Sequence, residues 1–164
     1  MMKKILVAVF MLTLMVSIGC ASDSNSNSIN SKDSKNSSNI TWVENLEDGI
    51  VIAKKENKNI LINFTGSDWC IWCKRLNGEV FTQKQFADYA KKNLVLVKLD
   101  FPRNTPQSEV TKQYNNNLAR KYGIQGFPTI ILLDKNGNFV YQTGYQEGGA
   151  DNYVKHLSQI FSKI

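Results

Sequence analysis

Apolar residues recur along most of this chain with one of two spacings. Helical spacing of three and four residues marks five segments, and short β-forming runs mark four others. The predicted helices carry their apolar residues at 46, 50 and 53; within 70–76; at 86, 89 and 90; at 110, 114 and 118; and at 153, 157, 160 and 161. The predicted strands cover residues 60–64, 94–99, 129–133 and 139–143. A run at 40–43 is too short to support a further strand by itself.

Capping and turn residues predict where several of these helices begin and end. Asn77-Gly78 should end the second helix, and Gly123 should end the fourth, since glycine and asparagine are typical C-terminal caps. Thr82 and Gln85 have the spacing of a capping box at the start of the third helix. These signals predict helices separated by short, well-defined breaks.

The order of elements predicts an α/β fold built on one central mixed sheet. Helices and strands alternate over most of the chain, which is typical of parallel strands. The tripeptide at 135–137 (KNG) lies between two β-forming runs and predicts a hairpin, which adds an antiparallel edge. The segment 101–107 contains two prolines and is predicted to be a loop. Helices should therefore cover both faces of the sheet.

Residues 1–19 are predicted to be an export signal. Two lysines precede an apolar run, 5–18, which has the length of a signal h-region and is short for a membrane span. Gly19-Cys20 resembles the end of a bacterial lipobox, in which the cysteine becomes an acylated N-terminus. Ser17 stands where that pattern usually has leucine, so an ordinary cleaved signal peptide is the alternative. We favour lipidation at Cys20, because a free thiol at the start of an exported protein would be a liability.

Residues 20–39 are predicted to be the lipidated cysteine and a disordered tether. Almost every residue from 21 to 39 is Ser, Asn, Asp or Lys, and such a segment buries too little apolar surface to offset its ordering entropy. The remaining residues, 40–164, are predicted to form one domain. The lipid anchor would hold this domain on a bacterial membrane, facing the periplasm or the cell surface.

The charge balance is basic and bears on the choice of partner. Lysine and arginine number 20 and aspartate and glutamate 14, which gives a formal net charge of +6. Nucleic-acid binding is one reading of such an excess. The basic residues are scattered and form no run, however, so we predict a solvated surface and no nucleic-acid partner.

The pair Cys70 and Cys73 carries the candidate chemistry. It follows a predicted strand and opens a predicted helix, where free N–H groups and the helix dipole stabilise a thiolate. A second thiol one turn later can attack a mixed disulfide formed by the first. We predict a redox pair in which Cys70 is exposed and Cys73 is buried.

A metal site is the main alternative for a C-x-x-C pattern. A structural zinc ion needs four ligands. Apart from Cys20, the chain offers two thiols and one histidine, His156, which lies in the last predicted helix. We therefore predict no metal and no other cofactor.

Several motifs, in this order, resemble the thioredoxin-like family. Residues 64–74 (FTGSDWCIWCK) are similar to its active-site stretch, in which tryptophan precedes the first cysteine. Residues 121–129 (KYGIQGFPT) are similar to the segment that carries its cis-proline. The hairpin at 135–137 and Gly144 match the hairpin and glycine that follow in the family. The resemblance covers residues 42–164, is strongest to exported proteins with a Ser-Asp-Trp-Cys-x-Trp-Cys site, and implies the thioredoxin fold.

The resemblance also implies a role for each matching residue. The implied catalytic residues are Cys70 as nucleophile, Cys73 as resolving thiol and Pro128 as a cis-proline beside them. The alternative for the proline is a trans residue at the start of a strand. Phe127 would offer backbone groups to a bound peptide. Trp69 and Trp72 flank the cysteines, and we interpret them as an apolar collar for substrate rather than as core residues.

Two departures from the family pattern bear on redox behaviour. Asn63, which cannot ionise, occupies the position of the family's buried aspartate, and Lys98 occupies that of its lysine. Ile71-Trp72 replaces the histidine-containing dipeptide of strongly oxidising relatives, and apolar neighbours stabilise a thiolate poorly. We therefore expect a reductase or isomerase rather than an oxidant.

The predicted function is a thiol–disulfide oxidoreductase that acts on protein cysteines outside the cytoplasm. Its predicted partners are proteins with disulfides or thiols, a membrane electron donor, and the membrane itself through the lipid anchor. The alternative is a thioredoxin-fold binding module without turnover, either a metallochaperone or an adaptor. Copper-handling relatives place a histidine near the C-x-x-C pair, a position that His156 does not occupy. A peroxidase fits less well, because the threonine and arginine that surround a peroxidatic cysteine are not evident.

Overall fold

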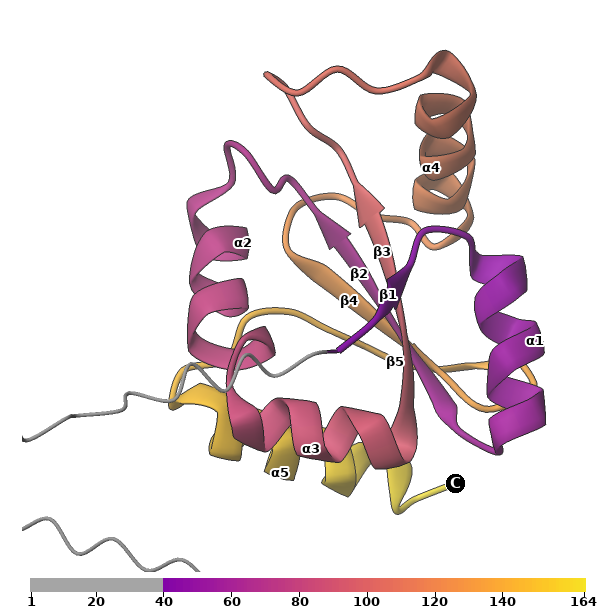
Figure 1. The fold of residues 1–164 in the computed structure, drawn as a ribbon, viewed down its shortest axis with the longest axis vertical. Coiled ribbons are helices and arrows are strands. Elements are labelled where there is room, and N and C mark those ends of the chain that lie inside the picture. The colour runs from indigo at the N-terminus through magenta and orange to yellow at the C-terminus, as the bar shows by residue number, and fades with distance from the viewer. Residues whose placement is uncertain (1–39) are drawn as a thin grey trace, which may run out of the picture. The chain divides into compact units, whose positions relative to one another are not determined.

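The structure, a computed structural model, describes residues 40–164 (Figure 1). The predicted export signal at 1–19, the acylation site Cys20 and the tether within 20–39 lie outside the described residues. No helix in the described part is both long and apolar enough to cross a bilayer.

Strands and helices alternate in the described part of the chain, as the apolar spacing predicts. The elements are β1 (Trp42–Val43), α1 (Leu46–Glu56), β2 (Asn59–Thr65), α2 (Ile71–Leu76), the π-helical turn η1 (Asn77–Phe81), α3 (Lys84–Asn93), β3 (Leu94–Asp100), α4 (Glu109–Lys121), β4 (Thr129–Leu133), β5 (Phe139–Thr143) and α5 (Gly149–Phe161). The short run at 40–43 does contribute a strand, β1, of two residues.

One mixed sheet of five strands, in the order β1-β3-β2-β4-β5, forms the centre of the domain. β1 and β2 both pair with β3 in parallel, whereas β4 is antiparallel to β2 and to β5. The predicted hairpin joins β4 to β5, and Gly137 adopts φ 89° there, a conformation that favours glycine. The predicted α/β fold with a parallel part and an antiparallel edge is confirmed.

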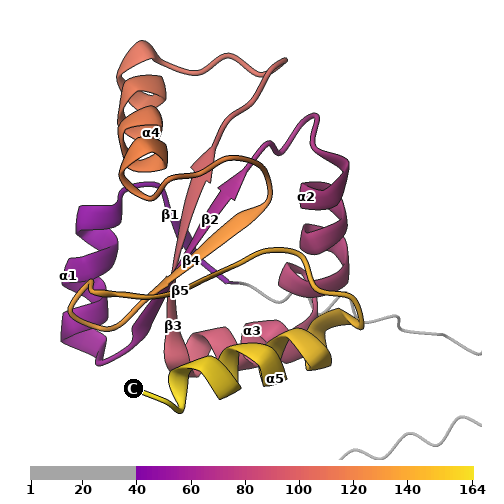
Figure 2. The ribbon, with the colours of Figure 1, turned by 180° about the vertical axis from the view of Figure 1, so that it is seen from behind.

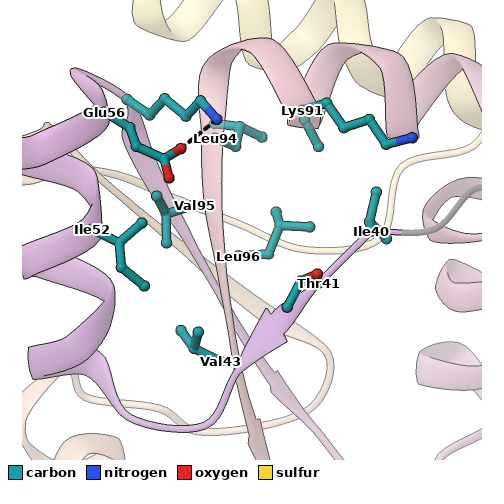
Figure 3. A pocket seen from close by; sticks show the side chains of 11 residues that line it. Ile40, Thr41, Val43, Ile52, Glu56, Lys91, Leu94, Val95 and Leu96 are labelled. Carbon is teal, nitrogen blue, oxygen red and sulfur yellow. Dashed lines mark hydrogen bonds and ion pairs between the residues drawn. The ribbon is translucent and has the colours of Figure 1, made fainter.

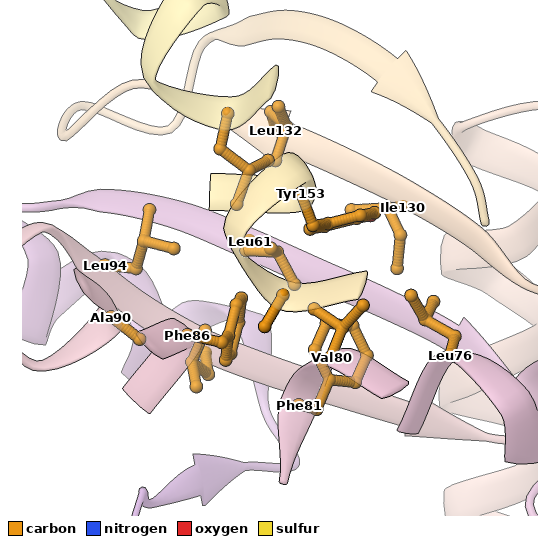
Figure 4. Close-up of a cluster of buried hydrophobic side chains, with 13 residues drawn as sticks. Leu61, Leu76, Val80, Phe81, Phe86, Ala90, Leu94, Ile130, Leu132 and Tyr153 are labelled. Atoms are coloured by element: carbon orange, nitrogen blue, oxygen red, sulfur yellow. The ribbon is translucent and has the colours of Figure 1, made fainter. Parts of the chain in front are cut away.

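Helices cover both faces of the sheet, with α1 and α4 on one side and α2, α3 and α5 on the other (Figure 1 and Figure 2). Side chains alternate between the two faces along each strand, so Ile60 and Ile62 pack under α1 and α4 while Leu61 packs under α3 and α5. Figure 4 shows the second of these clusters, in which Leu61, Phe86 and Tyr153 are fully buried. Both faces are thus closed by apolar contacts.

The α-helix α2 ends at Leu76 with Asn77 as its C-cap, as predicted, but the chain stays on a helical path beyond it, which was not predicted. Asn77 keeps right-handed helical angles, φ −61° and ψ −49°, and the chain continues into η1. The backbone N–H of Thr82 donates to the carbonyl oxygen of Asn77 at 3.0 Å, which closes a π-helical ring. The continuation is favoured because it buries Val80 and Phe81 in the core.

Two further sequence signals near helices are corrected. α3 begins at Lys84 with Gln83 as its N-cap and has no side-chain cap, so Thr82 and Gln85 do not form a capping box. The Thr82 hydroxyl instead donates to the carbonyl oxygen of Gly78 at 3.1 Å. Val110 was expected on the buried stripe of α4 but is 79% exposed, because the helix turns its first residues toward solvent.

A groove of about 320 Å³ lies at the β1 edge of the sheet, between β1, α1 and α3 (Figure 3). Its walls are mostly apolar, as Ile52, Leu94 and Leu96 illustrate. Glu56 and Lys58 form an ion pair of 2.6 Å at its rim. None of the predicted catalytic or substrate-binding residues lines this groove.

The parallel strands bring three connections to one edge of the sheet. β2 and β3 end side by side, with Thr65 opposite Asp100. β4 starts at the same edge, because Thr129 pairs with Phe64. The segments 66–70, 101–108 and 126–128 therefore meet where β2 and β3 end.

Candidate active site

Cys70 and Cys73 form a disulfide at the start of α2, with their Cα atoms 5.2 Å apart. Cys70 is the N-cap of that helix, and its sulfur accepts a hydrogen bond from the backbone N–H of Cys73 at 3.1 Å. This is the helix-start position predicted from the sequence. In this disulfide state both residues are buried, at 6% and 5% exposure, so the expectation of an exposed Cys70 is not met.

The Phe127–Pro128 peptide bond is cis, as the family resemblance implies. Pro128 directly precedes β4, and the hydroxyl of Thr129 donates to the carbonyl oxygen of Gly126 at 2.7 Å. Gly144 runs so close to this segment that a Cβ atom there would lie 3.2 Å from the carbonyl oxygen of Pro128. The matched glycine thus has a physical reason, which is close packing against the proline.

Trp69 forms a fixed wall beside the disulfide. Its indole Nε1 donates to the carbonyl oxygen of Phe101 at 2.8 Å, and its ring packs edge-on against Phe127 at 5.9 Å between centroids. The ring also lies against Gly66, where an added Cβ would meet indole carbon at 2.5 Å. Trp69 is therefore half-buried and held from three sides.

Trp72 is freer than Trp69, with 48% of its surface exposed. Its ring lies 5.4 Å from that of Tyr145, and the Arg75 guanidinium approaches both rings at about that distance. Glu79 joins the group, since it accepts hydrogen bonds of 2.6 Å from the Tyr145 hydroxyl and from Nε of Arg75. The two tryptophans thus flank the cysteines in different environments, one fixed and one open.

Asp68 organises the loop 101–108 and was missed by sequence reasoning. Its carboxylate accepts hydrogen bonds from the backbone N–H groups of Arg103, Asn104 and Thr105 at 2.7 to 3.0 Å. Asp100, at the end of β3, makes the reciprocal contact with the segment before the cysteines: its carboxylate accepts a hydrogen bond from the backbone N–H of Ser67 at 3.0 Å. The signal available in the sequence was an acidic residue just before a helix start, but its partners lie at least 35 residues away.

The backbone N–H of Arg103, followed by those of Asn104 and Thr105, lowers the pKa of Asp68 below its usual 3.8. A lowered pKa in the folded state means that these bonds stabilise the protein above the usual value and are lost as pH falls through the lowered one. We expect the amide NMR signals of 103–105 to titrate together with a midpoint below pH 3.8. In Asp68→Ala this shared titration should disappear, whereas Asp151→Ala, an exposed acid on α5, should retain it. An unchanged midpoint in Asp68→Ala would contradict the assignment.

Asn63 lies in β2 with only 7% of its surface exposed, and its Oδ1 has no hydrogen-bond partner among the described residues. It pairs with Lys98 of β3 in the sheet register. Both line a cavity of about 300 Å³ that also reaches Cys73 and Lys74. The titratable side chains on this side of Cys73 are thus two lysines, with no carboxylate lining the cavity.

The described residues contain no group of three or more His, Cys, Asp or Glu side chains that could hold a metal ion. His156 lies on α5, and its Nε2 is 3.0 Å from the hydroxyl of Thr143. Burial lowers the pKa of this histidine. It is engaged with β5 and not with the cysteine pair.

Comparisons with known proteins agree with this geometry. The family profile described as "Thioredoxin-like domain" matches residues 46–160. The disulfide bond reductase DsbH of Chlamydia pneumoniae is 32% identical over 119 residues, which are 73% of this chain and 71% of that protein. A solved structure titled DsbH Oxidoreductase has a TM-score of 0.71 and 28% identity, and the match covers 84% of this chain and 95% of that one.

Another relative has a much longer chain than this protein. The thiol:disulfide interchange protein DsbD of Colwellia psychrerythraea is 27% identical over 125 residues. Those residues are 74% of this chain but only 19% of DsbD. The chain therefore spans about a fifth of that relative's length.

Proposed function

The chain belongs to the thioredoxin-like family, and on this basis we propose that it is a thiol–disulfide oxidoreductase acting on the cysteines of other proteins outside the cytoplasm. One observation carries the proposal: Cys70 and Cys73 form a disulfide one helical turn apart, at the start of α2. A pair in this position can cycle between disulfide and dithiol without unfolding the helix, because the two sulfurs are already within bonding distance.

Exchange would proceed in two steps. The Cys70 thiolate attacks one sulfur of a substrate disulfide and forms a mixed disulfide, and the other substrate sulfur leaves as a thiolate that takes up a proton. The Cys73 thiolate then attacks the Cys70 sulfur, which restores the Cys70–Cys73 disulfide and releases the second substrate sulfur as a thiol. Two electrons pass from the protein to the substrate. A dithiol donor, which we propose to be a membrane protein, would reduce the pair again.

The substrate polypeptide would be bound by Phe127, Pro128 and the two tryptophans. Phe127 lies two residues before β4, and its ring packs against Trp69, the residue before Cys70, so its backbone groups would pair with an extended peptide that reaches the cysteine pair. Trp72 and Ile71 are exposed on the same helix start, Ile71 by 69%. They offer an apolar surface to the residues that flank a substrate cysteine.

The proposed direction is reduction. DsbH, the relative that matches over most of its length, is named a disulfide bond reductase. The dipeptide between the cysteines, Ile71-Trp72, contains no histidine or other donor that would stabilise the Cys70 thiolate strongly. Stabilisation of that thiolate is what makes a dithiol pair a strong oxidant.

We therefore expect a reduction potential nearer to about −270 mV, the thioredoxin value, than to about −120 mV, the DsbA value. Equilibration of the cysteine pair with glutathione buffers measures it, and reduction of insulin with dithiothreitol as donor tests turnover in the same preparation. A potential above about −180 mV would reverse the proposed direction. Binding of insulin without reduction would favour the alternative, a thioredoxin-fold module without turnover.

We also propose that Cys20 is acylated and anchors the domain to a membrane. The support is the lipobox-like Gly19-Cys20 and the polar segment 21–39 that follows it. In a bacterial host the full chain should partition into detergent on phase separation, whereas Cys20→Ala should stay in the aqueous phase or keep its unprocessed size. Equal partitioning and equal size of both proteins would show that Cys20 is not lipidated.

A further inference from the structure

We propose that Arg103 is a specificity-determining residue that binds an acidic side chain of the substrate polypeptide, next to the Cys70–Cys73 pair. The inference rests on the proposed function, since it names the class of substrate that the same site prefers. It is carried by the position of the Arg103 guanidinium, by the lack of a carboxylate paired with it among residues 40–164, and by the aromatic side chains against which it lies.

The structure holds Arg103 in place from two directions. Its guanidinium carbon lies 3.6 Å from the centroid of the Trp69 ring, which is the distance of a stacked cation–π contact. Its backbone N–H donates to Oδ1 of Asp68 at 3.0 Å, so the loop beneath the side chain is also fixed. A guanidinium that is already ordered loses little rotamer freedom when a ligand binds.

Arg103 remains without an ion partner within residues 40–164, where its guanidinium makes no hydrogen bond or salt bridge. The neighbouring carboxylates are already occupied: Asp68 accepts from the loop amides, and Asp100 accepts from the backbone and hydroxyl of Ser67. On the other side of the cysteines, Glu79 is taken by Arg75 and Tyr145. Arg103 is therefore an exposed cation without a salt-bridge partner in the described part of the chain.

Stacking on Trp69 covers one face of the guanidinium and leaves its N–H edge free. That edge matches a carboxylate in a bidentate hydrogen-bonded pair. Trp69 is bonded to Cys70 in the chain, and the Phe101 and Phe127 rings, 4.9 Å apart, continue the aromatic wall. When a substrate cysteine reacts with Cys70, the substrate residues next to that cysteine would therefore contact these aromatic side chains. Arg103 lies on the solvent-exposed side of the same aromatic surface.

The fitting ligand is an aspartate or glutamate within a few residues of the substrate cysteine. Lys74 adds to the positive field, although its ammonium group is engaged with the carbonyl oxygen of Asp68 at 2.8 Å. A basic flank would instead meet Arg103 as a like charge and bind less well.

The test compares two disulfide peptides that differ only in one residue beside the cysteine, aspartate in one and asparagine in the other. We expect the wild-type protein to reduce the aspartate peptide with a kcat/KM about fivefold higher at low salt, and Arg103→Gln to abolish that preference. Arg103→Lys should keep part of the preference for the aspartate peptide, because the lysine ammonium retains the positive charge but cannot form the bidentate hydrogen bonds of a guanidinium. The matched control is Arg120→Gln, which removes the same charge from an exposed position on α4 and should keep the full preference.

Two results would overturn the inference. If Arg103→Gln lowers kcat/KM for both peptides in proportion, the residue only supports the loop and Trp69. If Arg120→Gln reduces the preference equally, the effect comes from overall charge. Wild-type protein that reduces neither peptide would instead overturn the proposed function, which separates that failure from this one.

Discussion

The Cys70→Ser substitution is expected to lower the rate of disulfide reduction below about one thousandth of the wild-type value. A hydroxyl at this position cannot form the mixed disulfide on which both steps of exchange depend. The Cys73→Ser substitution should instead trap the substrate on the protein. Cys70 then forms the mixed disulfide, but nothing displaces the substrate, so the complex accumulates.

Non-reducing electrophoresis of cell extracts separates the two variants. Cys73→Ser should carry covalently attached partners that dithiothreitol releases, and their identity would name the substrates. The double variant Cys70→Ser/Cys73→Ser is the control and should carry none. If Cys70→Ser forms the adducts and Cys73→Ser does not, the proposed roles of the two cysteines are reversed.

Replacing Phe86 by alanine is expected to reduce the free energy of unfolding by about 3–5 kcal/mol. Phe86 is fully buried between α3 and the sheet, and its ring centroid lies 4.9 Å from that of Phe81 (Figure 4). Truncation removes apolar surface from the core and leaves a cavity that rigid neighbours on α5 and β3 fill only partly. Since a domain of this size is stable by about 5–15 kcal/mol, the loss is a large fraction of the total.

Val110→Ala is the control for this measurement, because it also removes methyl groups from a helical residue. Val110 is 79% exposed, so its substitution should change the unfolding free energy by less than about 0.5 kcal/mol. Urea denaturation of the oxidised protein, followed by circular dichroism, measures both. A loss for Val110→Ala comparable with that for Phe86→Ala would mean that α4 is docked differently from the arrangement described.

The inner strands of the sheet were predictable because they lie in a buried environment. Residues 60–64 and 129–133 are continuous β-forming runs, and only a strand covered on both faces uses such a run. The order of strands and helices then leaves few arrangements. β1 was at the limit of prediction, because its two residues are held by pairing with Leu96 and Val97 and not by a pattern of their own.

The failures lie where a local signal competed with packing. Asn77-Gly78 ends the α-helix as predicted, yet burial of Val80 and Phe81 keeps the chain on a helical path that the sequence did not indicate. Val110 shares the spacing of Tyr114 and Leu118, but it lies in the first turn of α4, beyond the reach of the sheet. Spacing predicts which residues share a helix face and not how far along the helix that face is covered.

At the site, the cysteine pair and Pro128 could be predicted because each lies in a local motif. The network of Asp68, Arg103 and Trp69 could not, because it joins segments that are far apart in the sequence and meet only when β2 and β3 end side by side. The Oδ1 atom of Asn63 is a similar case: the sequence shows an asparagine, and only the fold shows that no donor from residues 40–164 reaches this atom.

The π-helical turn η1 also has a consequence for how such a chain can vary in evolution. A π-helical ring contains one residue more than an α-helical ring, so this turn has the shape that a single-residue insertion leaves in a continuous helix. Gly78 is the natural residue to lose, because it carries no side chain and nothing lies within 4 Å of the position that a Cβ atom would take there. Its deletion would turn the π-helical ring back into an α-helical one, so the helix before it would keep its orientation relative to Val80 and Phe81. A relative that lacks this residue is therefore expected to keep both its core and the direction in which α2 presents the cysteine pair.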